Sequence, residues 1–311
     1  MKHSLFLITA YFFSFTGAFP QPLDTSVHRV LFLGNSITYN GTFITDMEAC
    51  YTLWHPAQKI EFINLGLPSE TVSGLSEDGH ADGRFPRPDL HERLHRILAS
   101  LKPDVVFADY GMNDGIYLPL EESRFKRYRQ GMEWLHDTLA ATGARVIMVT
   151  PPVYDEQRAG AKGYAAVLDA YADWLLSRQK TAGWEVADIH FAMKKYLEAH
   201  RKLDKSFGIN GFALADDGVH PGAAGHWLMA RQLLLHLHEK QALSYPDIHS
   251  VITAHVHGRQ IAALIAERQH FMKDAWLSAT GHTRPEMTAG MPMEQARLRS
   301  AAISVSLEAL Q

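Results

Sequence analysis

The sequence predicts an α/β fold, with three α/β/α layers built around a five-stranded parallel sheet. The first observation is an alternation, from about Val27 to Lys240, between short apolar runs and longer segments with apolar residues at helical spacing. The second is that the short runs are apolar at nearly every position, as in parallel strands buried on both faces. Strands and helices that alternate in this way form βαβ units.

Each short apolar run has the length of one strand. The runs cover residues 30–33, 60–64, 105–108, 146–149 and 185–187. Between them, apolar residues fall on single helical faces within 90–101, 125–139 and 164–175. Pro103 and Gly143 mark two helix-to-strand junctions. Residues 27–244 are therefore expected to form the main domain.

Residues 245–311 show no strand pattern. Apolar residues at helical spacing begin near Ile248 and continue after Gly258, and a last helix is expected over 293–310. This part of the sequence predicts a helical C-terminal extension packed on the main domain.

Residues 1–18 have the pattern of a secretory signal peptide. Lys2 and His3 precede an apolar run over 5–15, and small residues lead to Ala18, after which cleavage is expected. The run is shorter than the roughly 20 apolar residues of a transmembrane helix, and an uncleaved anchor is the alternative. The pattern predicts export to the periplasm or the exterior, without stable membrane insertion once the signal is removed. Cys50, the single cysteine, is expected to be buried.

The composition bears on partners and cofactors. Hydrophobic residues make up 46% of the chain, charged residues 21%, and the formal net charge is −4 without a long basic block. These values are typical of a globular protein and do not indicate nucleic acid or an anionic membrane surface as a partner. The 18 histidines include no His-Glu-x-x-His pair, and no paired-cysteine pattern occurs, so neither a metal nor another cofactor is predicted.

A serine follows the first predicted strand at a tight turn. Parallel sheets bind ligands beyond the carboxyl ends of their strands, and Gly34-Asn35-Ser36 lies at such an end. Ser36 is there a candidate nucleophile, with the N–H groups of the next helix facing any developing negative charge. The alternative, from this stretch alone, is that Ser36 only caps a helix.

The candidate base is His220. Asp217 lies three residues earlier, about one helical turn, so it can orient the imidazole and stabilise its charged form. Asp216 is a nearby competitor for this role. Pro221 is expected at the first position of a helix over 222–237. The alternative is a loop aspartate beside an unrelated surface histidine.

Three groups are candidate donors to a developing oxyanion. They are the backbone N–H groups of Ser36 and Gly66 and the side-chain amide of Asn113. Gly66 follows the second predicted strand and has no side chain to obstruct a reacting group, and Asn113 follows the third strand. The alternative is that Gly66 and Asn113 are ordinary turn residues.

Four segments together resemble the conserved blocks of the SGNH (GDSL-type) hydrolases. In order along the chain they read FLGNSIT, NLGLPSETVSGL, YGMND and DGVHPGAAGH. The resemblance covers roughly residues 27–240 and implies a flavodoxin-like fold. One departure is visible, because the family's Gly-Asp-Ser appears here as Gly34-Asn35-Ser36, a conservative change. The Gly-x-Ser-x-Gly elbow of the other large serine-hydrolase fold is not found in the sequence.

The resemblance also implies roles for individual residues. It implies a serine nucleophile at Ser36 and a catalytic pair at Asp217 and His220. It implies oxyanion donors at Gly66 and Asn113. The resulting hypothesis is an exported esterase that forms an acyl-enzyme on Ser36, with O-acetyl groups on carbohydrate as the first substrate class considered.

Two other hypotheses stay open at this point. An acyltransferase that moves an acyl group to a sugar hydroxyl would use the same residues. A non-catalytic carbohydrate-binding or partner-binding module could occupy the same scaffold, because fold does not imply function.

Three further polar features of the sequence are not expected to take part in catalysis. Arg84 and Arg87 lie in a loop after the second strand and are interpreted as solvated rather than as contacts to an anionic substrate. Asp114 is expected to shape its loop through local hydrogen bonds. The glycosylation pattern that begins at Asn40 is interpreted as chance, because a glycan would crowd Ser36.

Overall fold

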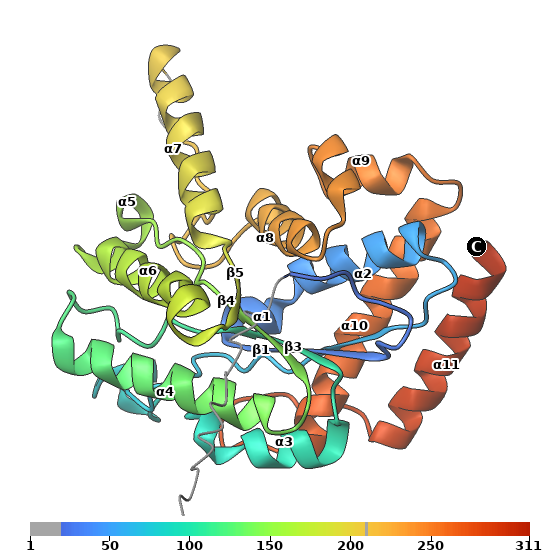
Figure 1. Cartoon of the computed structure of the whole chain (residues 1–311), viewed down its shortest axis with the longest axis horizontal. Helices are drawn as coiled ribbons and strands as arrows, with labels where there is room; N and C mark the ends of the chain where they lie inside the picture. The colour runs from blue at the N-terminus through green and yellow to red at the C-terminus, as the bar shows by residue number, and fades with distance from the viewer. Residues whose placement is uncertain (1–19, 209–210) are drawn as a thin grey trace, which may run out of the picture.

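The computed structural model describes residues 20–208 and 211–311 (Figure 1). The predicted signal peptide lies outside the described residues. One five-stranded parallel sheet has the strand order β2-β1-β3-β4-β5. The strands are β1 (Arg29–Gly34), β2 (Glu61–Asn64), β3 (Val105–Asp109), β4 (Arg145–Val149) and β5 (Glu185–Ala187). All the expected strands are found, and their ends differ from the expectation by at most one residue.

Helices cover both faces of the sheet, which confirms the three-layer prediction (Figure 1). One face carries α2 (Thr42–Trp54) and α8 (Ala223–His236), and the other carries α3 (Leu94–Leu101), α4 (Glu122–Ala140) and α6 (Tyr164–Ala182). The short elements are α1 (Ser36–Asn40), α5 (Glu156–Ala159), η1 (His80–Gly83), η2 (Leu90–Glu92) and η3 (Lys240–Ser244). Helix α7 (His190–Ser206) projects from the body of the molecule. None of the helices in the described ranges has the length and apolar character needed to cross a bilayer.

Strand β1 lies inside the core, between β2 and β3. Its residues from Val30 to Leu33 are buried, and the ring of Phe32 stacks on that of Phe107 with centroids 4.9 Å apart. Burial of such side chains is the main favourable term in folding, because each removes apolar surface from water. The continuous apolar pattern of the strand is thus explained by helices on both of its faces.

The register of the strands brings three loops together at the carboxyl ends of the strands. Gly34 pairs with Asp109, and Phe32 pairs with Asn64. Because these strands are parallel, the segments that follow β1, β2 and β3 emerge side by side. Ser36, Gly66 and Asn113 belong to those three segments.

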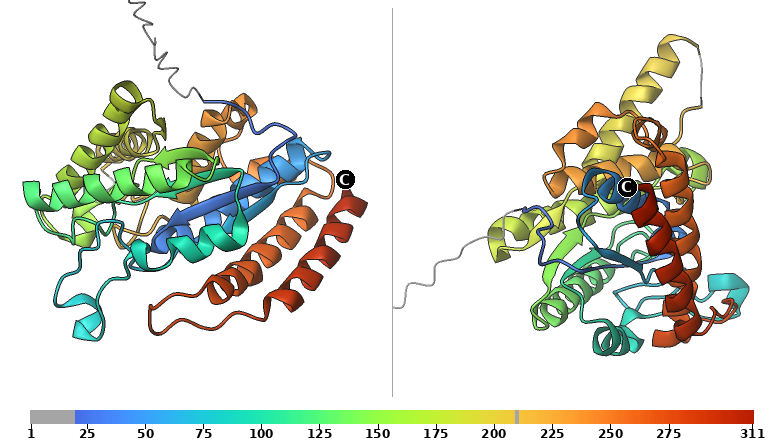
Figure 2. Two further views of the ribbon diagram at one scale, coloured as in Figure 1. Left: turned by 60° about the horizontal axis from the view of Figure 1, so that its bottom comes forward. Right: turned by 90° about the vertical axis from the view of Figure 1, so that its right-hand side faces the viewer.

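Three helices follow residue 245, as expected. They are α9 (Ile248–Thr253), α10 (Gly258–Thr280) and α11 (Met293–Leu310), and α11 has the predicted bounds. Helix α10 packs on α2 and β2, and α11 lies beside α10 (Figure 2). The side-chain amide of Gln269 donates to the Phe62 carbonyl of β2 at 2.7 Å and to Glu48 at 2.7 Å.

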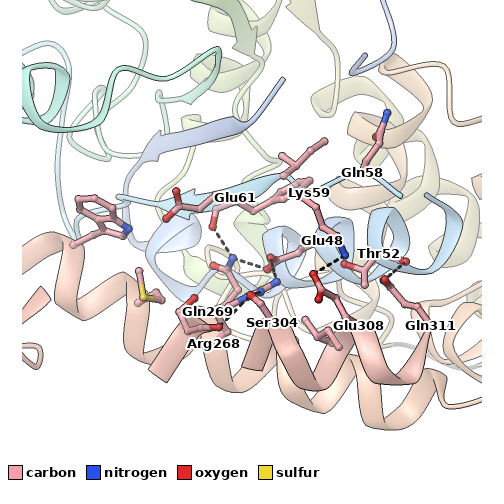
Figure 3. A pocket seen from close by; sticks show the side chains of 16 residues that line it. Glu48, Thr52, Gln58, Lys59, Glu61, Arg268, Gln269, Ser304, Glu308 and Gln311 are labelled. Carbon is pink, nitrogen blue, oxygen red and sulfur yellow. Dashed lines mark hydrogen bonds and ion pairs between the residues drawn. The ribbon is translucent and has the colours of Figure 1, made fainter. Parts of the chain in front are cut away.

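A cavity of about 300 Å³ lies between these helices and the sheet (Figure 3). The side chains of Glu48, Gln269 and Arg268 meet in it, and Arg268 donates to Glu48 at 2.7 Å. Ile60 and Glu61, at the amino end of β2, also line the cavity. The cavity therefore lies at the amino-terminal ends of the strands, whereas Ser36 lies at their carboxyl-terminal ends.

Two local expectations can be compared with the structure. Cys50 is buried as expected, and burial raises the pKa of its thiol. The placement of Pro221 in the first turn of a helix was wrong. Helix α8 begins at Ala223, with Gly222 as its N-cap. The N–H of Gly222 donates to the Leu214 carbonyl at 2.8 Å, and the backbone of Gly222 is extended, so Gly222 is not helical.

Candidate active site

Ser36 is the first residue of α1 and not its cap. The Asn35 side chain takes the capping role by accepting the Ile37 N–H at 3.0 Å. The Ser36 hydroxyl is therefore not needed by the helix, and its Oγ lies 2.9 Å from Nε2 of His220. The alternative that Ser36 only caps a helix is wrong.

His220 lies between Ser36 and Asp217. Its Nδ1 is 2.6 Å from Oδ2 of Asp217, while Oδ1 of Asp217 accepts the backbone N–H groups of Val219 and His220 at 2.8 and 2.7 Å. The segment forms a turn rather than a helix, but the two side chains lie on one side as expected. Asp217, rather than its neighbour Asp216, faces the imidazole.

The environment of Asp217 favours its ionised form. Burial acts to raise the pKa of this carboxyl, but hydrogen bonds from the His220 ring and from two backbone N–H groups outweigh burial, and the pKa is lowered. The side chains of His220 and Asp217 are 50% and 55% exposed. An ionised carboxylate is therefore available to orient His220, and both side chains are accessible to solvent.

Asn113 is buried near the carboxyl ends of the strands, and its amide is held from two sides. Nδ2 donates to the Glu70 carbonyl at 3.2 Å, and Oδ1 accepts the Tyr117 hydroxyl at 3.1 Å. An amide nitrogen carries two hydrogen atoms. Within the described chain Glu70 is its one acceptor, so the second hydrogen is available to a reacting oxygen.

Gly66 lies against the backbone of α1, where a Cβ atom would be 2.2 Å from the Tyr39 nitrogen. Glycine is thus required here by close packing. The Gly66 N–H donates to Oδ1 of Asn64 at 2.9 Å, and Nδ2 of Asn64 donates to the Thr38 carbonyl at 2.7 Å. The Gly66 N–H would have to leave or share Asn64 to serve an oxyanion. The sequence interpretation did not identify Asn64, although a polar residue that ends an apolar strand is a usable signal.

A buried ion pair supports the loop that holds Asn113. Arg93 binds both carboxylate oxygens of Glu70 at 2.6 and 2.7 Å, and both side chains are fully buried. The Tyr110 hydroxyl donates to the same carboxylate at 2.7 Å. The sequence interpretation missed these residues, and the available signal was a charged residue, Arg93, beside an apolar helical face.

The hydrogen bonds of the Asp114 side chain reach beyond its own loop, which the expectation of local bonds did not include. Its carboxylate is fully buried and accepts the N–H groups of Val72 and Ser73, both at 2.8 Å. Burial raises its pKa to about 6, against these hydrogen bonds. Because a buried carboxylate needs donors, Asp114 bonds to the neighbouring loop and fixes it to the Asn113 loop.

The interpretation of Arg87 as solvated was wrong. Its side chain is only 6% exposed and makes two hydrogen bonds to Glu77, at 2.7 and 2.6 Å. Its guanidinium lies 5.3 Å from the centre of the Tyr117 ring. Arg84 is more exposed and pairs with Glu286 from the loop before α11. Arg87 thus packs against Tyr117, whose hydroxyl contacts Asn113.

The part of the chain that the structure describes holds no group of three or more histidine, cysteine or acidic side chains placed to bind a metal ion. The groups gathered at the carboxyl ends of the strands are instead a hydroxyl, an imidazole, a carboxylate and an amide. Together they match the requirements of serine-based acyl chemistry.

A family model for the GDSL-like lipase/acylhydrolase family matches residues 32–228. The chain belongs to this family. The matched segment includes Ser36, Gly66, Asn113 and the Asp217–His220 pair, so the resemblance seen in the four sequence segments is confirmed. A comparison with curated protein sequences found no match.

Solved structures share the fold at low sequence identity. A catalytic mutant of Axe2, an acetylxylan esterase from Geobacillus stearothermophilus, is similar with a TM-score of 0.52 and 21% identity, over 68% of this chain and 94% of Axe2. LAE5, an alpha/beta hydrolase from the metagenome of Lake Arreo, Spain, has a TM-score of 0.52 and 23% identity, over 68% and 95%.

A gut microbial diltiazem-metabolizing enzyme, BT4096, has a TM-score of 0.56 and 21% identity. The match covers 71% of this chain and 49% of BT4096, about half of that protein's length. Family and fold together support a hydrolase that acts on esters.

Proposed function

We propose that this protein is an exported serine esterase that cleaves a carboxylic ester through an acyl-enzyme on Ser36. The observation that carries the proposal is the continuous contact from Asp217 to His220 to Ser36, with distances of 2.6 and 2.9 Å. Export rests on the sequence pattern of residues 1–18. N-terminal sequencing of the secreted protein, expected to start after Ala18, tests it.

The geometry supports a two-step mechanism. His220 takes the proton from Ser36 Oγ as this oxygen attacks the ester carbonyl, and Asp217 stabilises the imidazolium. The negative oxygen of the tetrahedral intermediate is bound by the Asn113 amide and the Ser36 N–H, and by Gly66 if its N–H is released from Asn64. His220 protonates the departing alkoxide, then activates water, which frees the acid from Ser36.

A saccharide O-acetyl ester is the substrate class that we propose. The exposed position of the Asp217–His220 pair leaves room for a bulky carrier on the alcohol side. Axe2, which shares the fold, is described as an acetylxylan esterase. Acetate release from acetylated sugars, compared with esters of longer acyl chains, tests this choice. Transfer of acetyl to an added sugar acceptor would instead favour an acyltransferase.

Ser36→Ala tests the proposed nucleophile. We expect kcat for p-nitrophenyl acetate to fall at least about 10³-fold, because the attacking oxygen is removed while the binding groups stay. Fluorophosphonate labelling should be lost in the same variant. Ser100→Ala is a matched control, since Ser100 lies on the exposed surface of α3 and only donates to the Arg96 carbonyl. Retention of most of the kcat by Ser36→Ala would refute the mechanism.

A further inference from the structure

The segment after Asn113 has an unfavourable backbone conformation at two consecutive residues. Ile116 and Tyr117 both have left-handed φ angles, 48° and 57°. Residues other than glycine rarely adopt such angles, and a β-branched residue such as isoleucine is a genuine outlier there. Conformations of this kind persist only where the surrounding structure holds them, and they are frequent at functional sites.

Tyr164 of α6 holds this segment in place. Its hydroxyl donates to the Met112 carbonyl at 2.7 Å and accepts the Gly115 N–H at 3.1 Å. A Cβ atom at Gly115 would lie 2.8 Å from the Tyr164 ring, so only glycine fits. The Ile116 N–H donates to the Asn113 carbonyl at 2.9 Å. The chain therefore reverses and returns toward Asn113.

The reversal places Tyr117 on the Asn113 amide. The Tyr117 hydroxyl donates to Oδ1 of Asn113 at 3.1 Å. Its ring stacks on Tyr164 with centroids 4.8 Å apart, and the Arg87 guanidinium lies 5.3 Å from its centre. Burial raises the pKa of Tyr117 to about 12, so the hydroxyl keeps its hydrogen at neutral pH. Tyr117 is therefore a fixed donor.

We propose that Tyr117 is a positioning residue of the oxyanion site, acting through Asn113. Its hydroxyl and the Glu70 carbonyl together fix the amide plane, so that the second N–H of Asn113 points at the reacting oxygen. A flipped amide would place its oxygen against the Glu70 carbonyl, which cannot donate, so this hydrogen bond would be lost, and the Tyr117 hydroxyl would have to accept instead of donate. The inference rests on the proposed function and assigns a role to the strained turn.

Tyr117→Phe removes the hydroxyl and keeps the ring. We expect kcat for p-nitrophenyl acetate to fall about tenfold with KM within about twofold, because one neutral hydrogen bond is lost and it acts on the transition state. The matched control is Tyr154→Phe. The Tyr154 ring lies 5.9 Å from that of Tyr117, but its hydroxyl accepts the Ala161 N–H, so kcat should not change. A raised KM with unchanged kcat in Tyr117→Phe would overturn the proposal.

A double-mutant cycle separates positioning from a structural effect. If Tyr117 acts through Asn113, Tyr117→Phe should cost about tenfold in the native background and less than about twofold in the Asn113→Ala background. Equal losses in both backgrounds would overturn the inference. If Asn113→Ala does not fold, inhibition by phenylboronic acid, which forms a tetrahedral adduct with serine, decides the question. Its Ki should rise in Tyr117→Phe by the factor lost in kcat/KM, and an unchanged Ki would overturn the inference.

Ser36→Ala is measured in the same assay. If Ser36→Ala is inactive and the cycle is additive, only the role of Tyr117 fails. If Ser36→Ala keeps its activity, the proposed function fails and the role of Tyr117 fails with it.

Discussion

The histidine–aspartate pairs His220–Asp217 and His190–Asp169 differ in the group that the second ring nitrogen contacts. His220 contacts Asp217 at 2.6 Å and turns its other nitrogen to the Ser36 hydroxyl. His190, at the start of α7, contacts Asp169 at 2.9 Å and turns its other nitrogen to the Pro151 carbonyl, also at 2.9 Å.

Their surroundings differ as well. The His190 side chain is 2% exposed, against 50% for His220. Asp169 also binds Lys194 at 2.7 Å, and the hydrogen bond from His190 is the main cause of its lowered pKa. A histidine–aspartate pair thus indicates catalysis only when the free imidazole nitrogen faces a nucleophile. Otherwise the same pair joins two elements, here α6 and the start of α7, and the other ring nitrogen contacts the segment that follows β4.

Replacing each histidine by alanine should give the largest difference in effect between the two pairs. We expect His220→Ala to lower kcat by about 10⁴-fold or more, because His220 is the one base that contacts Ser36 among the described residues. His190→Ala should instead lower the free energy of unfolding by about 1–3 kcal/mol, because buried hydrogen bonds are lost, with kcat within about threefold. Ester hydrolysis and urea unfolding measure the two effects. A large kcat loss in His190→Ala with unchanged stability would contradict this division.

Replacement of each carboxylate is expected to give a smaller difference. Asp217→Asn keeps the shape but removes the charge that stabilises the imidazolium, so kcat should fall about 10²–10⁴-fold. Asp169→Asn is the matched control, because this residue also contacts a histidine, and its kcat should stay within about threefold. Steady-state kinetics on the two variants provides the test, and equal losses would show that Asp217 has no special role.

A third histidine, His226, has no carboxylate partner in the described ranges. It therefore shows how burial without an ion pair changes the pKa of a histidine. Burial, and then the nearby charge of His220, lower its pKa to about 4 from 6.5. The unfolded chain therefore binds a proton between pH 6.5 and 4 that the folded chain does not bind. Stability should be lost as pH falls through this window, by up to about 3 kcal/mol.

Urea unfolding of the wild type at pH 6.5 and 4.5 measures this loss. His226→Phe keeps a ring beside Phe43 and cannot titrate, so its stability should depend less steeply on pH. The same pH dependence in both proteins would show that His226 is not the cause.

Asp216 should give the smallest effect. It is exposed and adjoins Asp217, but it is not the carboxylate that contacts His220. Asp216→Ala is expected to change kcat by less than about twofold. A loss like that of Asp217→Asn, measured in the same kinetic assay, would mean that the two acids exchange roles in solution.

The sheet was predictable because its strands are apolar runs buried on both sides, and this pattern is local in the sequence. The positions of Ser36 and Asn113 followed from the same reasoning, since residues after parallel strands meet at one edge. Helix ends were harder to place. Pro221 fits a first helical turn by its own geometry, but the contact of Gly222 with Leu214 moved the start of the helix.

The supports of the site were the part that could not be predicted. The contacts of Asp114 with Val72, and of Arg87 with Tyr117, join segments that are far apart in the chain. Side-chain type alone favours solvent for an arginine in a glycine-rich and proline-rich loop. Only the packing of the two loops against each other makes a buried position possible, and no local pattern encodes that packing.

The hydrogen bond from Gln269 to the Phe62 carbonyl has a consequence for the behaviour of the protein in solution. Strand β2 is at the edge of the sheet, and an edge strand is a template for pairing with a strand of another molecule. Helix α10 lies along β2 and occupies one of its carbonyl groups. A chain without residues 245–311 would keep every proposed catalytic residue and yet expose this edge, so such a chain is expected to aggregate through β2.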